Sequence, residues 1–214
     1  MPLGDAELND LGRRVARGDL AALGVLVDFY RPRLRAMLQL RMDRRFQGRI
    51  DASDVLQEAF LEVSTRLDEF SQNPAVPFYL WLRRITGQRL AAVYRFHLGT
   101  QARDAGREIS LFDGAFPAAN SAALAAHLVG RLSSPSTAAV RAELKAKLED
   151  VLNGMDEIDR EIIVLRHFEE LTNSEAAQLL DIKPSAACNR HVRALERLRQ
   201  ALDETPEFAS ELWT

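Results

Sequence analysis

Arginine side chains gather in three blocks of this 214-residue sequence. Seven arginines accompany one aspartate between residues 31 and 49, six accompany one aspartate between 83 and 107, and four arginines with a lysine accompany one glutamate between 183 and 199. Each block has the local charge to bind a polyanion such as nucleic acid. Because the net charge of the chain is −3, its overall charge does not attract a polyanion, and the blocks must act locally.

Carboxylates are concentrated between these basic blocks. Residues 51–69 hold six carboxylates against one arginine, and residues 149–175 hold nine against two. In the first segment Asp54, Gln57 and Glu58 recur at helical spacing, opposite a stripe of apolar residues. Such a row is either a binding face for a cationic partner or an ordinary solvated helix face.

Enzymatic chemistry has no support in the sequence, because no combination of nucleophile, base and metal ligands can be assembled. The single cysteine, Cys188, excludes an internal disulfide, and the four histidines, at positions 97, 127, 167 and 191, are too scattered to predict a metal site. We therefore expect a protein that is not an enzyme and that has no catalytic residues, metal or cofactor.

Membrane and secretion signals are also missing from the sequence. The first twenty residues lack the apolar run of a signal peptide, and eighteen apolar residues never occur together. We expect a cytoplasmic protein without membrane insertion.

Three long helices are predicted in the first half. The segment 20–42 has apolar residues at three- and four-residue steps, and Pro32 is expected to bend or divide it. The segment 51–70 repeats the pattern, with Asp51 or Ser53 as its N-cap. After the breaker run "SQNPAVP" at 71–77, a third helix is predicted over 78–99. Its expected stripe is Phe78, Leu82, Ile85, Arg89, Ala92 and Phe96.

A change of composition divides the chain. Between about residues 99 and 136 glycine, proline, alanine and serine are frequent, which is typical of a flexible linker, with a short helix near 121–129. Helical patterns return from residue 137 onward. The predicted fold is all-α, with one small helical domain over 1–98, a linker over 99–136 and a second small helical domain over 137–214.

The segment 174–195 predicts two short helices joined by a tight turn. Asp181 occupies a turn position that favours a positive φ angle, and Pro184 suits the first turn of the next helix. The buried side of that helix is predicted to contain Ala187, His191, Ala194, Leu198 and Ala201. With small polar residues and arginines on its free side, it has the dimensions and chemistry to enter the major groove of DNA. The alternative is a helical hairpin with a solvated charged side.

Three longer runs resemble one family in combination. They are "SDVLQEAFLEV", "FYLWLRRI" and "DREIIVLRHFEELTNSEAAQLLDIKPSAACNRHVRALERLR". Together they resemble bacterial RNA polymerase sigma factors of the small extracytoplasmic-function (ECF) group, in the sigma-70 superfamily, over residues about 20–98 and 140–202. The resemblance implies a sigma region two bundle and a sigma region four helix-turn-helix. It implies a subunit that binds core RNA polymerase and promoter DNA to direct transcription initiation, and it suggests an antagonist, an anti-sigma factor.

The resemblance also implies roles for individual residues. Asp54, Gln57 and Glu58 would contact a basic coiled coil of the polymerase clamp. The minus-ten element would be bound by Gln72 and Asn73, which would hold an extruded base, and by Arg83, Arg84, Gln88, Arg89 and Arg95, with Tyr79, Trp81 and Tyr94 interleaved. Trp81 as a core residue is the open alternative. The minus-thirty-five element would be read or flanked by Cys188, Asn189, Val192 and Arg193, with backbone contacts from Arg166, Ser185 and Arg190.

The sequence departs from the family pattern in the second of the two short helices and in the turn before it. Asp181 stands in place of the usual turn glycine, Ala186 of a threonine, Ala187 of a core valine and Cys188 of a common basic residue. These departures affect the expected promoter sequence more than the expected activity.

Two other functions fit parts of the sequence. A helix-turn-helix regulator whose first half senses a ligand or partner explains residues 140–202, but it leaves the Asp-x-x-Gln-Glu helix unexplained. Sequence-specific DNA binding without polymerase would favour it. A helical adaptor would use its charge blocks for protein contacts alone, and it would show no salt-dependent DNA binding.

Overall fold

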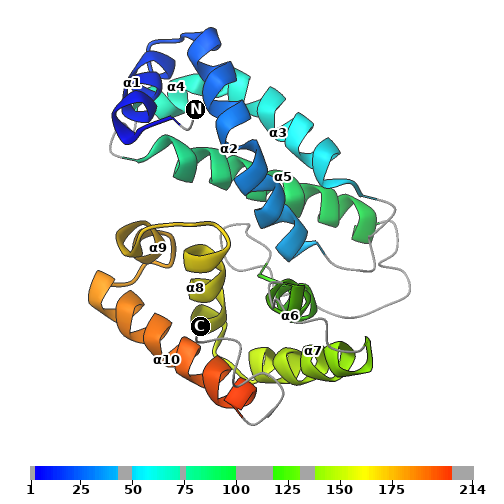
Figure 1. The fold of residues 1–214 in the computed structure, drawn as a ribbon. Helices are drawn as coiled ribbons and strands as arrows, with labels where there is room; N and C mark the ends of the chain where they lie inside the picture. Colours follow the sequence, from blue (N-terminus) through cyan, green and yellow to red (C-terminus); the bar gives the residue numbers. More distant parts are fainter. Residues whose placement is uncertain (1–2, 43–49, 73–75, 100–117, 131–137, 204–214) are drawn as a thin grey trace. The chain divides into compact units, whose positions relative to one another are not determined.

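The computed structural model describes residues 3–42, 50–72, 76–99, 118–130 and 138–203, and every regular element in these ranges is an α-helix. The chain divides into two compact units, Met1–Gln39 with Asp43–Pro117 and Leu40–Met42 with Ala118–Thr214. Figure 1 shows the helices of each unit. The predicted all-α class is therefore confirmed. Among the described helices, none is long and apolar enough to span a membrane.

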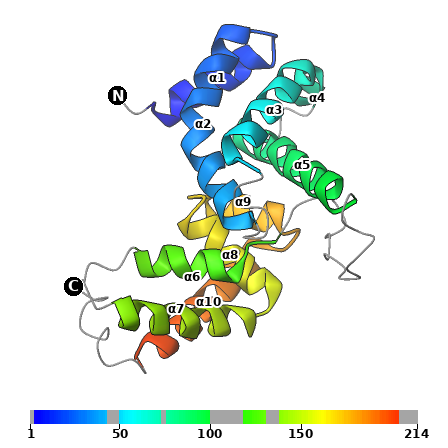
Figure 2. The same cartoon turned by 90° about the vertical axis from the view of Figure 1, so that its right-hand side faces the viewer.

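The first unit is built on long helices that bury apolar stripes. It contains α1 (Asp5–Val15), α2 (Leu20–Arg41) as far as Gln39, α3 (Ala52–Thr65), α4 (Leu67–Gln72) and α5 (Phe78–Gly99), and α3 packs along α5. Figures 1 and 2 both show these two helices side by side. Side chains in its core, each worth about 1.5–3 kcal/mol when fully buried, include Leu26, Leu34, Met37, Leu38, Leu56, Leu82, Ile85 and Leu90.

Local sequence signals account for the starts and continuity of these helices. Asp51 is the N-cap of α3 and accepts a hydrogen bond from the backbone N–H of Ser53, so the first of the two predicted caps is used. Pro32 lies inside α2 without dividing it. Its missing N–H costs one hydrogen bond, but Leu26 and Leu34 on either side are fully buried, and their packing favours one continuous helix.

The buried side of α5 differs from the predicted stripe. Phe96, expected in the core, is 71% exposed, whereas Tyr79, Trp81 and Tyr94 are buried. Trp81 packs against Phe70 of α4, with ring centroids 5.2 Å apart. The prediction was wrong because a wide core surrounds this helix on more than one side, and an apolar period alone does not select which aromatic residues enter it.

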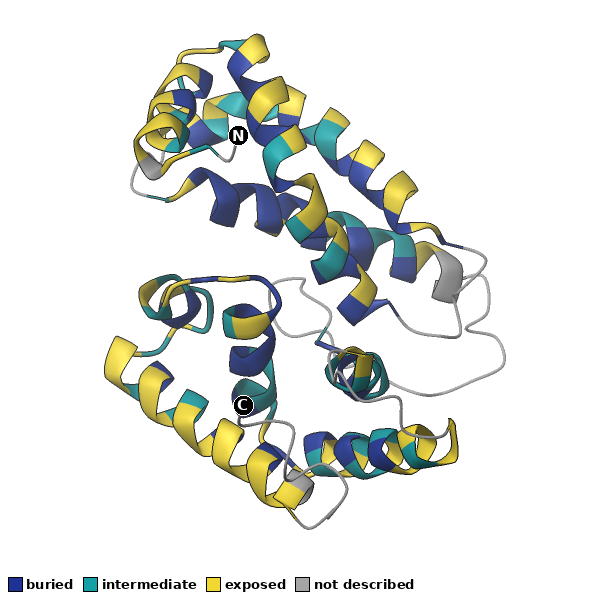
Figure 3. Ribbon diagram, viewed as in Figure 1, coloured by how far each residue is buried: buried dark blue, intermediate teal, exposed yellow. Residues whose placement is uncertain are grey.

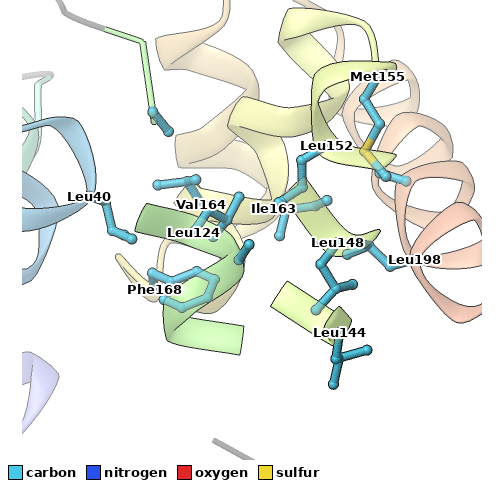
Figure 4. Close-up of a cluster of buried hydrophobic side chains, with 13 residues drawn as sticks. Leu40, Leu124, Leu144, Leu148, Leu152, Met155, Ile163, Val164, Phe168 and Leu198 are labelled. Atoms are coloured by element: carbon cyan, nitrogen blue, oxygen red, sulfur yellow. The ribbon is translucent and has the colours of Figure 1, made fainter. Parts of the chain in front are cut away.

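In the second unit the last helix packs with one side against three others. It contains α6 (Ser121–Gly130), α7 (Ala138–Asn153), α8 (Glu157–His167), α9 (Asn173–Leu179) and α10 (Pro184–Asp203); α6 packs on α7, and α10 contacts α7, α8 and α9. Figure 3 shows the exposed side that α10 retains. Figure 4 shows its apolar core, to which Leu124, Leu144, Leu148, Leu152, Met155, Ile163, Val164, Phe168 and Leu198 contribute.

The predicted linker contains a packed segment. Residues 118–130 belong to the second unit, because Leu124 and Ala125 of α6 are fully buried in its core. The other residues of the 99–136 segment, apart from Gly99, lie outside the described ranges. The second unit is therefore larger than the predicted domain 137–214, while the rest of the domain division stays a prediction.

The turn between α9 and α10 follows the sequence signals. Thr172 caps α9 and forms a capping box with Glu175. Asp181 has a φ angle of 51°, as predicted for this position, and α10 begins at Pro184. Aspartate is among the few residues that tolerate this left-handed conformation, so the chain can turn here without glycine.

Candidate functional site

One exposed row on α3 carries the predicted acidic residues. Asp54, Gln57 and Glu58 are all exposed, and Leu61 lies one helical turn beyond Gln57 on the same side and is 65% exposed. We call these four residues the α3 face. An exposed leucine beside carboxylates offers a partner both charge and apolar area. Leu61 was not among the predicted site residues, although its i+4 spacing from Gln57 already placed it on this side.

A polar row on α5 contains several of the predicted DNA contacts. Arg84, Gln88 and Arg95 recur on the side opposite the core, where Arg84 and Arg95 are exposed and Gln88 is half-buried. We call these three residues the α5 face. Gln72 is exposed at the end of α4, and Asn73 lies outside the described residues. The α5 face presents two guanidinium groups and one amide, which suits phosphates and base edges.

Carboxylates of α3 and α4 already contact this basic row. Arg84 lies 3.6 Å from Glu69, and Arg89 donates to Glu58 at 2.5 Å. Arg66 donates to Glu62 at 2.6 Å, to Glu69 at 2.7 Å and to the amide oxygen of Gln88 at 3.2 Å. The hydrogen bond from Arg66 lowers the pKa of Glu69, and its bond to Glu69 raises the pKa of Arg66. Arg66, Glu62, Glu69, Arg84 and Gln88 thus form one network along α3, α4 and α5, and Arg89 with Glu58 forms a second contact between α5 and α3.

Arg83 and three aromatic residues of the predicted DNA-binding set are buried. Arg83 is only 5% exposed. Tyr79 packs against Tyr30 with ring centroids 5.0 Å apart, and the Arg33 guanidinium covers its ring at 4.0 Å. Tyr79, Trp81 and Tyr94 are therefore core residues rather than stacking surfaces for unpaired bases. The sequence did not reveal that these three aromatic residues are buried, because α5 also buries positions on both sides of its predicted apolar stripe.

The exposed side of α10 carries most residues predicted for the second DNA element. Ser185, Cys188, Asn189, Val192 and Arg193 are all exposed. We call them the α10 face. The buried side opposite them includes Ala187 and Ala194, which have no exposed surface, while His191 is half-buried. The α10 face thus combines hydrogen-bond donors, a thiol, an apolar side chain and one cation on a single helix, and its arginine, amide and apolar groups are types that can contact base edges.

Two arginines that were predicted to contact the DNA backbone form hydrogen bonds within the protein. The Arg166 side chain is half-buried, and its Nη1 donates to the carbonyl of Leu171 in the loop before α9. Arg190 donates to Asp159 at 2.7 Å and to Asp156 at 3.1 Å. The hydrogen bond to Asp159 raises the pKa of Arg190. Arg190 therefore faces two carboxylates of the protein itself, while its predicted contact with DNA phosphate stays a prediction.

A histidine pair joins α8 to α10. The Nε2 atoms of His167 and His191 are 2.7 Å apart, and the two rings stack with centroids 4.9 Å apart. Burial, followed by the neighbouring His167 and Arg166, lowers the pKa of His191. His191 was predicted on the inner side of its helix, but its partner could not be predicted, because His167 is 24 residues away in the sequence.

Comparison with known proteins gives consistent matches over nearly the whole chain. A family model described as Sigma-70, region 4 matches residues 151–200. RNA polymerase sigma factor NccH of Alcaligenes xylosoxydans xylosoxydans is 31% identical over 196 residues, covering 91% of this chain and 94% of NccH. RNA polymerase sigma-H factor of Pseudomonas aeruginosa is 28% identical, covering 90% of this chain and 92% of that protein.

A solved structure is similar as well. CnrH, determined in complex with the cytosolic domain of CnrY, has 25% sequence identity to the chain and a TM-score of 0.53. The match covers 92% of this chain and 97% of CnrH.

Proposed function

The chain belongs to the RNA polymerase sigma factors of the sigma-70 superfamily, in the extracytoplasmic-function group to which its relatives from Haemophilus influenzae and Escherichia coli are assigned, and we propose that it directs promoter-specific transcription initiation through three separate faces. The α3 face binds core RNA polymerase, while the α5 and α10 faces bind promoter DNA. The observation that carries the proposal is that an exposed carboxylate row on α3 and two arginine-containing rows on α5 and α10 lie on different helices. The protein has no catalytic site of its own and acts in the cytoplasm, where core polymerase is.

The polymerase contact is assigned to Asp54, Gln57, Glu58 and Leu61. The two carboxylates suit a basic surface and steer association, while burial of Leu61 supplies affinity that charge alone does not. All four side chains are accessible without movement of the helix, which begins at a capped end and so holds the row in place.

The minus-ten element is assigned to the α5 face, with Arg89, Gln72 and Asn73 as further contacts. Arg84, Arg89 and Arg95 meet phosphates, and the amides of Gln72 and Asn73 hold an extruded base. Arg84 and Arg89 must exchange their carboxylate partners for phosphate on binding. Arg83 is left out of this set because of its burial.

The minus-thirty-five element is assigned to the α10 face. Cys188, Asn189, Val192 and Arg193 lie on the exposed side of a helix that follows a tight turn, and Ser185 lies at its N-terminal end, where phosphate is favoured. Arg166 is retained as a flanking contact, because its side chain is half-buried rather than buried, although one of its nitrogens already donates to the carbonyl of Leu171.

An antagonist protein is the third proposed partner. CnrH is bound to the cytosolic domain of CnrY in its solved structure, and CnrH shares its fold with this chain. We infer that an anti-sigma factor covers one or more of the three faces of this chain until a signal releases it.

Reconstitution with core polymerase tests the function. The purified chain should be retained by immobilised core polymerase, and the assembled holoenzyme should give run-off transcripts whose start sites map to one promoter class. The variant Glu58→Arg should reduce retention, whereas Arg193→Glu should preserve retention and abolish specific transcripts. The proposal would be refuted if the chain did not bind core polymerase. Sequence-specific DNA binding by the chain without polymerase would support a helix-turn-helix regulator instead.

A further inference from the structure

Arg190 connects α10 to the beginning of α8. Its Nη1 lies 2.7 Å from Oδ1 of Asp159 and 3.1 Å from Oδ1 of Asp156, which are 31 and 34 residues earlier in the chain. Side-chain exposure is unequal within this cluster, since the Asp159 side chain is only 6% exposed. A buried carboxylate is costly unless it is paired and hydrogen-bonded, so Asp159 depends on the guanidinium of Arg190.

The second carboxylate ties the contact to the helix end. Asp156 is the N-cap of α8, and its Oδ1 also accepts a hydrogen bond from the backbone N–H of Ile158. One guanidinium thus meets both the cap and the first turn of α8. The pair links a defined point on α8 to a defined point on α10.

Packing between these helices gives little rotational control by itself. The α10 side chains that enter the core beside Arg190 include Ala187 and Ala194, whose single methyl groups offer few interlocking contacts. Side-chain tips lie about 5–6 Å from a helix axis, so a rotation of about 10° moves them by about 1 Å. Hydrogen bonds to base edges tolerate only a few tenths of an ångström. Directional contacts are therefore needed to hold the α10 face in register, and two join α8 to α10 beside these alanines: the His167–His191 pair and the ion pair of Arg190 with Asp159, which is the charged and less exposed of the two.

We propose that Arg190 is a positioning residue that sets the rotation of the recognition helix on α8 through Asp159 and Asp156, and that it does not contact DNA phosphate. This inference rests on the proposed function of the α10 face. Neighbouring side chains then have different roles. Asn189 and Arg193 point to solvent and contact DNA, while Arg190 points to α8 and fixes the positions of Asn189 and Arg193.

Promoter binding by the holoenzyme separates the two roles of Arg190. Holoenzyme containing the full chain first selects a promoter duplex from random-sequence DNA, and this duplex is then the labelled probe. Arg190→Gln and Asp159→Asn should each weaken binding, roughly fivefold or more for Arg190→Gln, without changing the slope of log affinity against log salt. The double variant should bind no more weakly than Arg190→Gln, because it no longer contains an unpaired buried carboxylate.

Arg193→Gln is the matched control, since it removes an exposed arginine from the same helix. It should lower the salt slope by about one and add its effect to that of Asp159→Asn. If Arg190→Gln lowers the slope in the same way while Asp159→Asn binds as the unmodified chain does, Arg190 is a phosphate contact and the proposal is wrong.

Hydrogen exchange on the free chain tests the positioning without polymerase or DNA. Amides in the first turn of α8 and along α10 should exchange faster in Arg190→Gln and Asp159→Asn, but not in Arg193→Gln. If exchange changes as expected and the holoenzyme selects no promoter, the proposed function fails while the helix contact stands. Unchanged exchange in both variants would overturn the positioning role whatever the transcription result.

Discussion

Arg89 of α5 donates to Glu58 of α3 at 2.5 Å, so a side chain proposed to bind DNA is paired with one proposed to bind polymerase. Both side chains are partly exposed, and such a pair is worth only about 0.2–1 kcal/mol. A partner that takes up Glu58 can therefore release Arg89 at little cost. The two binding events share one weak contact within the first unit.

Replacement of Glu58 should separate these two events. In Glu58→Gln, affinity for core polymerase should fall because a carboxylate is lost, whereas binding of the free chain to single-stranded DNA should rise by up to about fivefold because Arg89 is released. Fluorescence anisotropy of a labelled strand at low salt measures the gain. Asp54→Asn, which removes an exposed carboxylate one turn earlier, should not produce it; an equal gain in both variants would show a general charge effect.

Leu61 should contribute affinity for polymerase without contributing stability. Its side chain is already 65% exposed, so Leu61→Ala should leave the thermal midpoint unchanged and weaken binding to core polymerase by about tenfold. Leu20→Ala on α2 is the matched control, because Leu20 is 64% exposed and lies outside the α3 face. Equal losses of affinity in the two variants would remove Leu61 from the interface.

Cys188 provides a chemical probe of the α10 face. It is the single cysteine of the sequence and is exposed, so a maleimide reagent will modify this helix selectively. We expect modification to block specific transcription by the holoenzyme, and bound promoter duplex to slow the modification. Mass spectrometry follows the reaction, and Cys188→Ser should be resistant to the reagent. Rapid modification in the presence of saturating promoter would place this side chain away from DNA.

The unfolding free energy should fall at mildly acidic pH because of His191. Burial, His167 and Arg166 lower its pKa in the folded chain, so the unfolded chain binds the proton more readily. Stability is therefore complete above the unfolded pKa of about 6.5 and decreases as the pH falls from there toward the lowered folded value. Urea unfolding at pH 7.5 and pH 5.5 measures this. His191→Gln should reduce the pH dependence, and His127→Gln on α6 should preserve it.

Much of the local structure could be predicted from short sequence patterns. The N-cap at Asp51, the positive φ angle of Asp181 and the start of α10 at Pro184 all agree with the structure. Each depends on the residue itself and on neighbours a few positions away. The packing of α6 was harder to predict, because an alanine-rich segment with weak periodicity is typical of a linker until a neighbouring helix covers it.

By itself the sequence determined the all-α class, the resemblance to sigma factors and the rows of residues on α3 and α10, since helical spacing and motif order are properties of the chain. Only the tertiary structure decided which arginine side chains are exposed and could contact DNA. Arg83 is buried and Arg190 is paired with Asp159, whereas Arg84, Arg95 and Arg193 are exposed. The reason is physical: burial and ion pairing depend on side chains that the fold brings together from distant positions, and no local pattern records those contacts.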